Sequence, residues 1–335
     1  MDWSKLLELS LKSLNLNYNI LVSSLPELMS VSSLSALPNP AFFFLVYVDD
    51  IIITGRKSYE VQSLISHLHM LFSLKDLGPL NFLLGIEVHK LHDGNFHLSQ
   101  GKYVTDLLER AKMLNPKSMP TPMIIGALLS AQLGNLMQDP TLYRSIVGAL
   151  HYVTIIRPEI SYYNKVCQFM QHPFDIHWKT IKRILRFLKG TTHHGLLLHK
   201  PDNLFVTGYS DVDWASDPDD RISTLGYCVY LGGNLVSWSS KKQQTVSRSS
   251  TKAKYCGLAH VTTKILWLQS LLEELGVKQT KPPLVWCDNL STISLSVNLL
   301  VYLRTKHMEL DLYFVRGKVI EKKLQVNHVL LWIKQ

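Results

Sequence analysis

An apolar segment interrupted by two adjacent carboxylates, Asp49 and Asp50, constrains the fold of this chain most. Residues 44–48 before them and 51–54 after them are rich in β-branched and aromatic side chains, which predicts a strand, a turn at the two aspartates and a second strand. A bare carboxylate is costly to bury unless it is paired or binds a metal, and carboxylate oxygens suit Mg²⁺. An ordinary polar turn is also consistent with this pattern, because Asp is common in turns.

Length, composition and charge limit the class of protein. The chain has 335 residues, enough for two domains, and its hydrophobic content of 46% is normal for a globular protein. Its formal net charge of +9 and pI near 9.2 suit a polyanionic partner such as nucleic acid. The excess charge is spread along the chain, so these values favour nucleic acid but are also compatible with a basic surface that has no such partner.

The cysteines and the apolar runs indicate the compartment. No two of the four cysteines form a Cys-x-x-Cys pair, so neither a zinc site nor a disulfide framework is indicated, and we expect buried thiols in a reducing compartment. The apolar run at 41–48 is far shorter than the ~20 residues that span a bilayer. The first residues also lack the basic-then-apolar order of a signal peptide. We therefore expect a soluble intracellular protein of the nucleus or cytoplasm that does not bind a membrane.

Helical spacing dominates the segment after the carboxylate pair. The expected elements are helices at 58–72, 102–113 and 143–152 and a strand at 95–100. Three prolines in residues 116–122 predict a connector. Residues 1–40 show helical spacing only at their start and no clean period afterwards, so we assign no function to them.

A further helix is expected at residues 177–190, with apolar residues on one side and basic residues on the other. The basic residues are Lys179, Lys182, Arg183 and Arg186. Such a face could follow a nucleic-acid backbone. A solvated basic face explains the same pattern equally well.

The pattern changes to short strands after residue 200. Strands are expected at 204–210, 226–231, 235–239, 284–287 and 324–330, a long helix at 250–275, a short helix after 287 and a longer one at 308–322. This order of strands and helices is typical of a ribonuclease H fold, a mixed sheet flanked by helices. The fold class predicted for the chain is therefore α/β.

Several motifs give this sequence a family resemblance. They are Tyr47-Val48-Asp49-Asp50, the segment 75–88, and the segments 208–215, 237–243, 286–289 and 304–307. Together they resemble the Pol polyprotein of copia-type LTR retrotransposons, over most of the chain. The resemblance implies a poorly matching segment at 1–40, a reverse transcriptase palm at 41–122, a helical thumb and connection at 123–200, and a C-terminally truncated ribonuclease H domain at 201–335. It also implies a plant source.

The resemblance assigns roles to four carboxylates. Asp49 and Asp50 correspond to the Mg²⁺ ligands of the polymerase hairpin. Asp211 and Asp288 correspond to two of the four carboxylates that hold two Mg²⁺ ions about 3.5–4 Å apart in ribonuclease H. Asp213 ranks lower, because we expect it on the opposite face of the same strand.

Departures from the family pattern indicate lost chemistry. Lys254 stands where the family has its second ligand, a glutamate, and should repel a cation. Lys252 replaces a residue that would cap the same helix against Ser249. In the family, the fourth ribonuclease H ligand lies in a C-terminal helix, and residues 330–335 do not match that helix. The third polymerase carboxylate of the family lies upstream of the hairpin.

We therefore interpret the chain as a remnant of a retrotransposon RNA-directed DNA polymerase and ribonuclease H that lacks catalysis. Two alternatives stay open: a working ribonuclease H or polymerase completed by a second chain, and a nucleic-acid-binding module without catalysis. The expected partner is an RNA–DNA hybrid or another nucleic acid. The sequence does not specify an oligomeric state.

Overall fold

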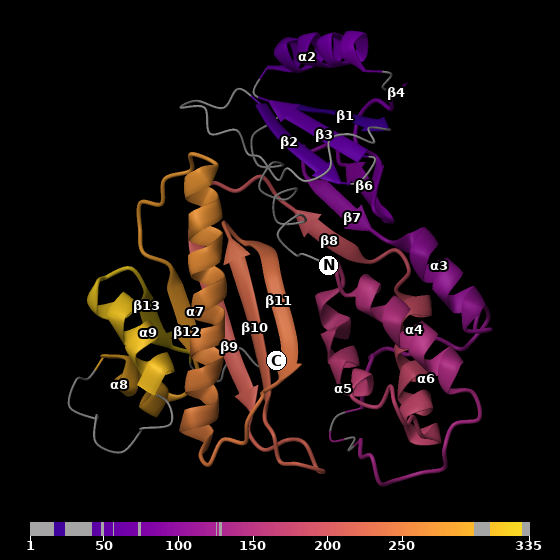
Figure 1. Ribbon diagram of the computed structural model, residues 1–335, viewed down its shortest axis with the longest axis vertical. Helices are drawn as coiled ribbons and strands as arrows, with labels where there is room; N and C mark the ends of the chain where they lie inside the picture. The colour runs from indigo at the N-terminus through magenta and orange to yellow at the C-terminus, as the bar shows by residue number, and fades with distance from the viewer. Residues whose placement is uncertain are drawn as a thin grey trace. The chain divides into compact units, whose positions relative to one another are not determined.

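The computed structural model describes residues 17–23, 42–47, 50–55, 57–72, 75–124, 126, 129–297 and 309–329, with side chains from residue 51 onward. The chain forms two compact units (Figure 1). The first comprises Met1–Ser99, Leu196–Asn203 and Gln269–Gln279, and the second comprises Gln100–Gly195, Leu204–Leu268 and Thr280–Gln335. In the described parts of the chain, no helix combines the length and apolar character needed to cross a bilayer.

The hairpin predicted around the two aspartates is present in the first unit. Strand β2 (Phe42–Tyr47) pairs antiparallel with β3 (Asp50–Gly55), and Tyr47 is the register partner of Asp50. Asp50 is therefore the first residue of the second strand, and the prediction that it belongs to the turn is wrong. Asp49, the other aspartate of the predicted turn, lies outside the described residues.

The sequence analysis missed a strand in the same sheet. Strand β1 (Asn17–Ser23) pairs antiparallel with β3 and with the short β4 (Lys75–Asp76), so the strand order is β2-β3-β1-β4. Residues 51–53 of β3 are all buried, as expected for a strand that is an uninterrupted apolar run. The predicted helix is confirmed as α2 (Ser58–Leu71), which buries Val61 and Ile65.

A second sheet has the order β5-β6-β7-β8. Its strands are β5 (Phe82–Leu83), β6 (Ile86–Lys90), β7 (Phe96–Ser99) and β8 (Gly195–Leu198). Leu84 and Gly85 connect β5 to β6 with φ values of +50° and +70°. Two consecutive positive φ values are typical of the tightest hairpin turns, which favour glycine. The strand predicted at 95–100 is confirmed as β7, whereas β8 was not predicted.

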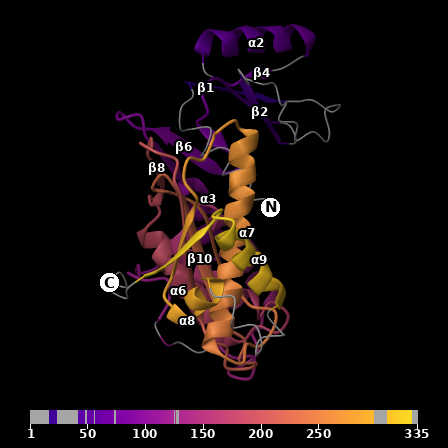
Figure 2. The same ribbon diagram turned by 90° about the vertical axis from the view of Figure 1, so that its left-hand side faces the viewer.

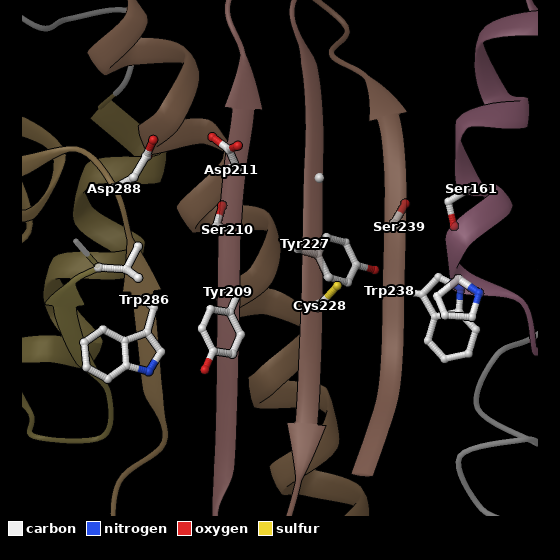
Figure 3. A pocket seen from close by; sticks show the side chains of 13 residues that line it. Ser161, Tyr209, Ser210, Asp211, Tyr227, Cys228, Trp238, Ser239, Trp286 and Asp288 are labelled. Carbon is white, nitrogen blue, oxygen red and sulfur yellow. The ribbon is translucent and has the colours of Figure 1, made fainter. Parts of the chain in front are cut away.

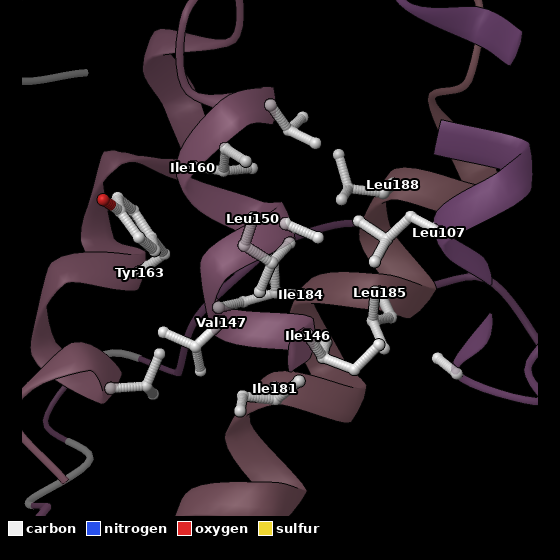
Figure 4. Packing of buried hydrophobic residues seen from close by; sticks show 14 of the residues in the cluster. Leu107, Ile146, Val147, Leu150, Ile160, Tyr163, Ile181, Ile184, Leu185 and Leu188 are labelled. Carbon is white, nitrogen blue, oxygen red and sulfur yellow. The ribbon is translucent and has the colours of Figure 1, made fainter. Parts of the chain in front are cut away.

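Helices form one part of the second unit. They are α3 (Gly101–Arg110), α4 (Pro140–Val153), the 3₁₀ helix η1 (Pro158–Tyr163), α5 (Asn164–Cys167) and α6 (Asp175–Gly190). Asp139 begins α4 by accepting a hydrogen bond from the Leu142 amide at 2.9 Å, and Pro140 follows it. Apolar residues of α4 and α6, among them Leu150 and Ile184, meet in a buried cluster (Figure 4). Burial of these faces explains why the helical periodicity predicted α4 and α6 correctly.

His177 gives this helical part a pH-dependent stability. The side chain has no exposed surface, accepts a hydrogen bond from the Phe174 amide at 3.0 Å through Nδ1 and donates one from Nε2 to the Ser130 carbonyl at 3.1 Å. Burial lowers the pKa of His177 below its ordinary 6.5, although the Ser130 carbonyl and the charges of Asp219 and Asp175 oppose that effect. The neutral ring is therefore the form that the folded chain holds.

We expect the unfolded chain to take up a proton at His177 as the pH falls below about 6.5, while the folded chain does not. His177 thus stabilises the fold at neutral pH, and this contribution declines at about 1.4 kcal/mol per pH unit below that point until the folded pKa is reached. Urea unfolding of the unaltered chain and of His177→Gln between pH 5 and 8 measures the effect. The difference in unfolding free energy between the two proteins should shrink toward acid pH, and a constant difference would contradict the assignment.

The rest of the second unit is a mixed sheet of order β11-β10-β9-β12-β13. Its strands are β9 (Val206–Asp213), β10 (Thr224–Leu231), β11 (Asn234–Lys242), β12 (Leu284–Cys287) and β13 (Gln325–His328). The first three are antiparallel, whereas β12 runs parallel to β9 and β13 parallel to β12. This order confirms the predicted α/β class and the mixed sheet expected for a ribonuclease H-like fold.

The long helix α7 (Ser250–Glu274) covers one face of this sheet (Figures 1 and 2). It is followed by α8 (Leu290–Val297) and α9 (Glu309–Ile320). Gly208 of β9 and Gly257 of α7 allow the close approach: a Cβ at Gly208 would lie 2.8 Å from Ile265 Cδ1, and a Cβ at Gly257 would lie 2.7 Å from Val212 Cγ2. The helix and strand therefore approach closely at both ends of their contact.

Specific hydrogen bonds join the helical part of the second unit to its sheet. Trp238 Nε1 of β11 donates to the Thr154 carbonyl at 3.1 Å, and Asn164 Nδ2 donates to the Ser240 carbonyl at 2.6 Å. Asp219, in the loop after β9, accepts a hydrogen bond from Ser130 Oγ at 2.5 Å. These bonds tie the helices and the sheet into one unit.

Candidate functional site

Asp211 and Asp288 are brought together by the pairing of two parallel strands. In the register of β9 with β12, Ser210 lies opposite Cys287. Asp211 follows Ser210 and Asp288 follows Cys287. Because the two strands are parallel, the two aspartates are also neighbours. Figure 3 shows the two carboxylates beside each other. The structure therefore brings together the two carboxylates that the resemblance singled out; their role as metal ligands stays a prediction.

Lys254, from the beginning of α7, lies between the two carboxylates. Its Nζ hydrogen-bonds Asp288 Oδ2 and lies 3.4 Å from Asp211 Oδ1. The Lys254 and Asp288 side chains are only 16% and 14% exposed, whereas that of Asp211 is 53% exposed. Lys254, which the resemblance places where the family has a glutamate, is thus ion-paired with both Asp211 and Asp288.

Electrostatics favour the charged form of Lys254. Burial alone would lower the pKa of its ammonium, but the hydrogen bond and charge of Asp288, together with the charge and hydrogen bond of Asp211, outweigh burial and raise that pKa above its ordinary 10.5. The ammonium is therefore protonated at neutral pH. Asp288 Oδ1 is buried and has no hydrogen-bond partner among the side chains and backbone that the structure describes.

The expected position of Asp213 is wrong. Burial alternates along β9, with Tyr209, Asp211 and Asp213 exposed and the residues between them buried. Side chains two apart in a strand point to the same face, so Asp213 shares the face of Asp211. Strand β9 also continues to Asp213 rather than ending at Asp211. Asp213 nevertheless lies two positions, about 7 Å, further along the strand, beyond the pair with Asp288.

A pocket adjoins the carboxylates on the face of the sheet opposite α7. Its volume is about 330 Å³, and the aromatic residues Tyr209, Tyr227, Trp238 and Trp286 line it together with Pro158 and Ser161 of η1. Asp211 and Asp288 lie at one end of it (Figure 3). This pocket was not predicted. Tyr209, Trp238 and Trp286 lie in one row across the sheet, on the side away from Ser210, which contacts α7.

The residues at the paired carboxylates do not fit a divalent cation. Mg²⁺ prefers several oxygen ligands at about 2.0–2.1 Å, and a protonated lysine offers hydrogen-bond donors but no lone pair. Within the described residues no group of three or more His, Cys, Asp or Glu side chains could hold a metal ion. Lys254 takes the space and the charge that a cation bound to Asp211 and Asp288 would need.

The basic residues of α6 do not form one open face. The Lys179 side chain is 74% exposed beside Asp175, and Lys182 is exposed with its Nζ 5.8 Å from the centre of the Trp178 ring. Arg183 instead hydrogen-bonds Thr121 Oγ1 at 2.7 Å, and the Arg186 carbonyl accepts a bond from the Met119 amide. The connector at residues 116–122 therefore runs along the arginine side of α6, and the lysines are its accessible cations.

Fold and site together define an α/β protein with a ribonuclease H-like sheet in which Asp211 of β9 lies beside Asp288, the residue after the neighbouring parallel strand β12. Residues 36–125 match the family model described as reverse transcriptase (RNA-dependent DNA polymerase). The Pol polyprotein from transposon RE1 of Arabidopsis thaliana is 45% identical over 288 residues, 86% of this chain and 20% of that polyprotein. The Pol polyprotein from transposon TNT 1-94 of Nicotiana tabacum is 36% identical over 299 residues, 86% of this chain and 22% of its own length.

An uncharacterized mitochondrial protein of Arabidopsis thaliana is 45% identical over 226 residues, which are 67% of this chain and 93% of that protein. The chain belongs to the family of retrovirus-related Pol polyproteins of copia-type retrotransposons. It spans about a fifth of the length of the polyproteins it matches. Among solved structures, LC11-RNase H1 from compost is similar over 37% of this chain and 84% of its own, with 15% identity and a TM-score of 0.29.

Proposed function

We propose that this chain is a segment of a retrotransposon Pol polyprotein whose ribonuclease H-like domain does not cleave the RNA of an RNA–DNA hybrid. The supporting observation is the position of Lys254 Nζ, within 3.4 Å of Asp211 Oδ1 and hydrogen-bonded to Asp288 Oδ2. Hydrolysis at a two-metal site depends on cations that activate water and stabilise the leaving oxygen. An ammonium can neutralise the two carboxylates but cannot supply either effect.

A Mg²⁺-dependent cleavage assay on a labelled RNA–DNA hybrid tests this proposal. The unaltered chain should cleave no faster than Asp211→Asn, and an active ribonuclease H in the same buffer verifies the hybrid and the ions. Cleavage by the unaltered chain that disappears in Asp211→Asn would refute the proposal. The same result would support the alternative of a working nuclease.

A retained ability to bind nucleic acid is a second candidate function. Lys179, Lys182 and Lys189 are exposed at intervals of one and two turns along one side of α6, and the whole chain carries a formal charge of +9. Exposed lysines on one helix can neutralise phosphates without reading the sequence. Arg183 and Arg186 contribute less in this arrangement, because the Arg183 guanidinium hydrogen-bonds Thr121 Oγ1 and the Nε atoms of both arginines are buried.

We expect substitution of Lys179, Lys182 and Lys189 by Gln to weaken binding to an RNA–DNA hybrid and to flatten its dependence on salt. Each lost phosphate contact should reduce the slope of log K against log salt by about 0.9, so the triple variant should lose about 2–3. A matched variant with Gln at the exposed Lys278, Lys281 and Lys322 carries the same charge change and should keep the slope. Equal slopes for the two triple variants would show that α6 is not the binding surface.

A further inference from the structure

We infer that the Lys254 ammonium is a built-in counter-ion for Asp211 and Asp288. It occupies the place of a divalent cation and so excludes one. The single change Lys254→Glu would therefore convert the pair into a divalent-cation site. This inference deepens the proposed loss of cleavage and names its cause. The sequence replacement alone does not require it, because a lysine at this position could have pointed away into solvent. The structure instead directs Nζ into the space between the carboxylates.

The packing of α7 on β9 holds Lys254 in this position. Gly257 lies about one turn after Lys254 and packs closely against β9. A Cβ added there would be 3.0 Å from the Oγ atom of Ser210, which precedes Asp211. The neighbouring Ala253 and Tyr255 have no exposed surface, so the helix cannot rotate about its axis without disturbing the core. Lys254 is therefore confined to the side of α7 that meets the carboxyl ends of β9 and β12.

Charge and burial make the ammonium a strong competitor for a metal ion. It is linked covalently to the site, so its local concentration is high and does not depend on the solution. With Lys254 and Asp288 less than a fifth exposed, solvent screens the interaction only in part. A divalent cation that binds beside the ammonium is repelled by its like charge. One that displaces the ammonium must break its ion pairs with Asp211 and Asp288.

The two aspartates still offer oxygens that a cation could use once the ammonium is removed. Asp288 Oδ1 is buried without a hydrogen-bond partner in the described part of the chain, and Oδ2 is held by Lys254. The Asp211 side chain is 53% exposed, so a cation can reach it from solvent, and its Oδ1 accepts a hydrogen bond from the Val212 amide at 2.7 Å. A glutamate at position 254 would add a third carboxylate from the helix, and three carboxylates with bound water form a suitable oxygen set for Mg²⁺ or Mn²⁺.

Two measurements on the full chain test the inference without relying on activity. Isothermal titration calorimetry with MnCl₂ gives the Mn²⁺ affinity, and thermal unfolding with and without MnCl₂ gives the stabilisation by Mn²⁺. Lys254→Glu should bind Mn²⁺ at least tenfold more tightly than the unaltered chain and should gain thermal stability from it. Lys254→Gln removes the ammonium without adding a ligand, so its Mn²⁺ affinity should lie between those of the unaltered chain and Lys254→Glu. Lys252→Glu is the matched control, because it makes the same charge change two residues earlier on α7, at a residue whose amide bonds Ser249 Oγ at the beginning of the helix.

Each result decides the inference. Tight Mn²⁺ binding by Lys254→Glu that disappears when Asp288→Asn is added supports it. Equal Mn²⁺ affinity in the unaltered chain and in Lys254→Glu overturns it, as does equal affinity in Lys252→Glu and Lys254→Glu. Should Lys254→Glu fold poorly, a saturable Mn²⁺ stabilisation of the unaltered chain that requires Asp288 would overturn the inference by itself. An unaltered chain that binds no Mn²⁺ yet cleaves a hybrid would refute the proposed function while leaving the cation assignment intact.

Discussion

Replacing Lys254 by Met should lower the free energy of unfolding by about 2–4 kcal/mol, measured by urea titration at pH 7 and low salt. Met fills a similar volume but carries no charge, so Asp211 and Asp288 would face each other without a counter-ion. Removing one partner of a fully buried ion pair costs about 3–5 kcal/mol, because a charge is left behind without compensation. The value expected here is somewhat lower, since Asp211 is 53% exposed and water can solvate it.

A double-mutant cycle separates this effect from lost packing. Asp288→Asn removes the buried charge, so adding it to Lys254→Met should recover about half or more of the stability lost. The matched substitution Lys252→Met on the same helix should change stability by less than about 0.5 kcal/mol, as surface substitutions usually do. If Lys254→Met is as stable as the unaltered chain, the ammonium does not hold the carboxylates together.

Gly257→Ala should destabilise the chain by about 1–3 kcal/mol, the usual cost of adding a methyl group to a packed interior. The new Cβ would lie 2.7 Å from Val212 Cγ2 and 3.0 Å from Ser210 Oγ. Val212 is buried in the central strand of the sheet and cannot move aside easily. Helix α7 would have to shift away from β9, which would also move Lys254 relative to Asp211.

Gly148→Ala provides the comparison for this change. Gly148 lies in α4 and is also helical, but no atom lies within 4 Å of a Cβ built there. Alanine at an exposed helical position should raise stability by about 0.5–1 kcal/mol, because it restricts the unfolded chain more than glycine does. Thermal unfolding of both variants should therefore give shifts of opposite sign. Stabilisation by both substitutions would show that α7 and β9 are not closely packed at Gly257.

The sequence predicted most of the elements because their hydrophobic patterns are strong. The helices α2, α4, α6 and α7 have continuous apolar faces. The strands β9 and β11 alternate between buried and more exposed residues, and β12 is a short apolar run. Strand β1 was missed because its residues lie in a segment without a clean period, and its pairing with β3 depends on contacts far apart in the sequence. Strand β8 is a similar case, since it joins a sheet whose other strands lie about a hundred residues earlier.

The site was predictable in its parts but not in its arrangement. Motif resemblance identified Asp211, Asp288 and the replacement at Lys254, but spacing along a chain does not show where a flexible lysine side chain points. The error at Asp213 was different, because the alternation of a strand already places residues 211 and 213 on one face. The contact of Arg183 with Thr121 was also beyond prediction, because a helical pattern does not show which loop covers it.

The most direct test of whether Lys254 occupies the cation position is a crystal structure of the unaltered chain after a soak in MnCl₂. The diffraction data are recorded at a wavelength where manganese scatters anomalously. We expect no anomalous peak between Asp211 and Asp288, and electron density for the Lys254 ammonium in contact with both carboxylates. Two anomalous peaks about 3.5–4 Å apart at these carboxylates, with Lys254 turned away, would contradict this view of the site.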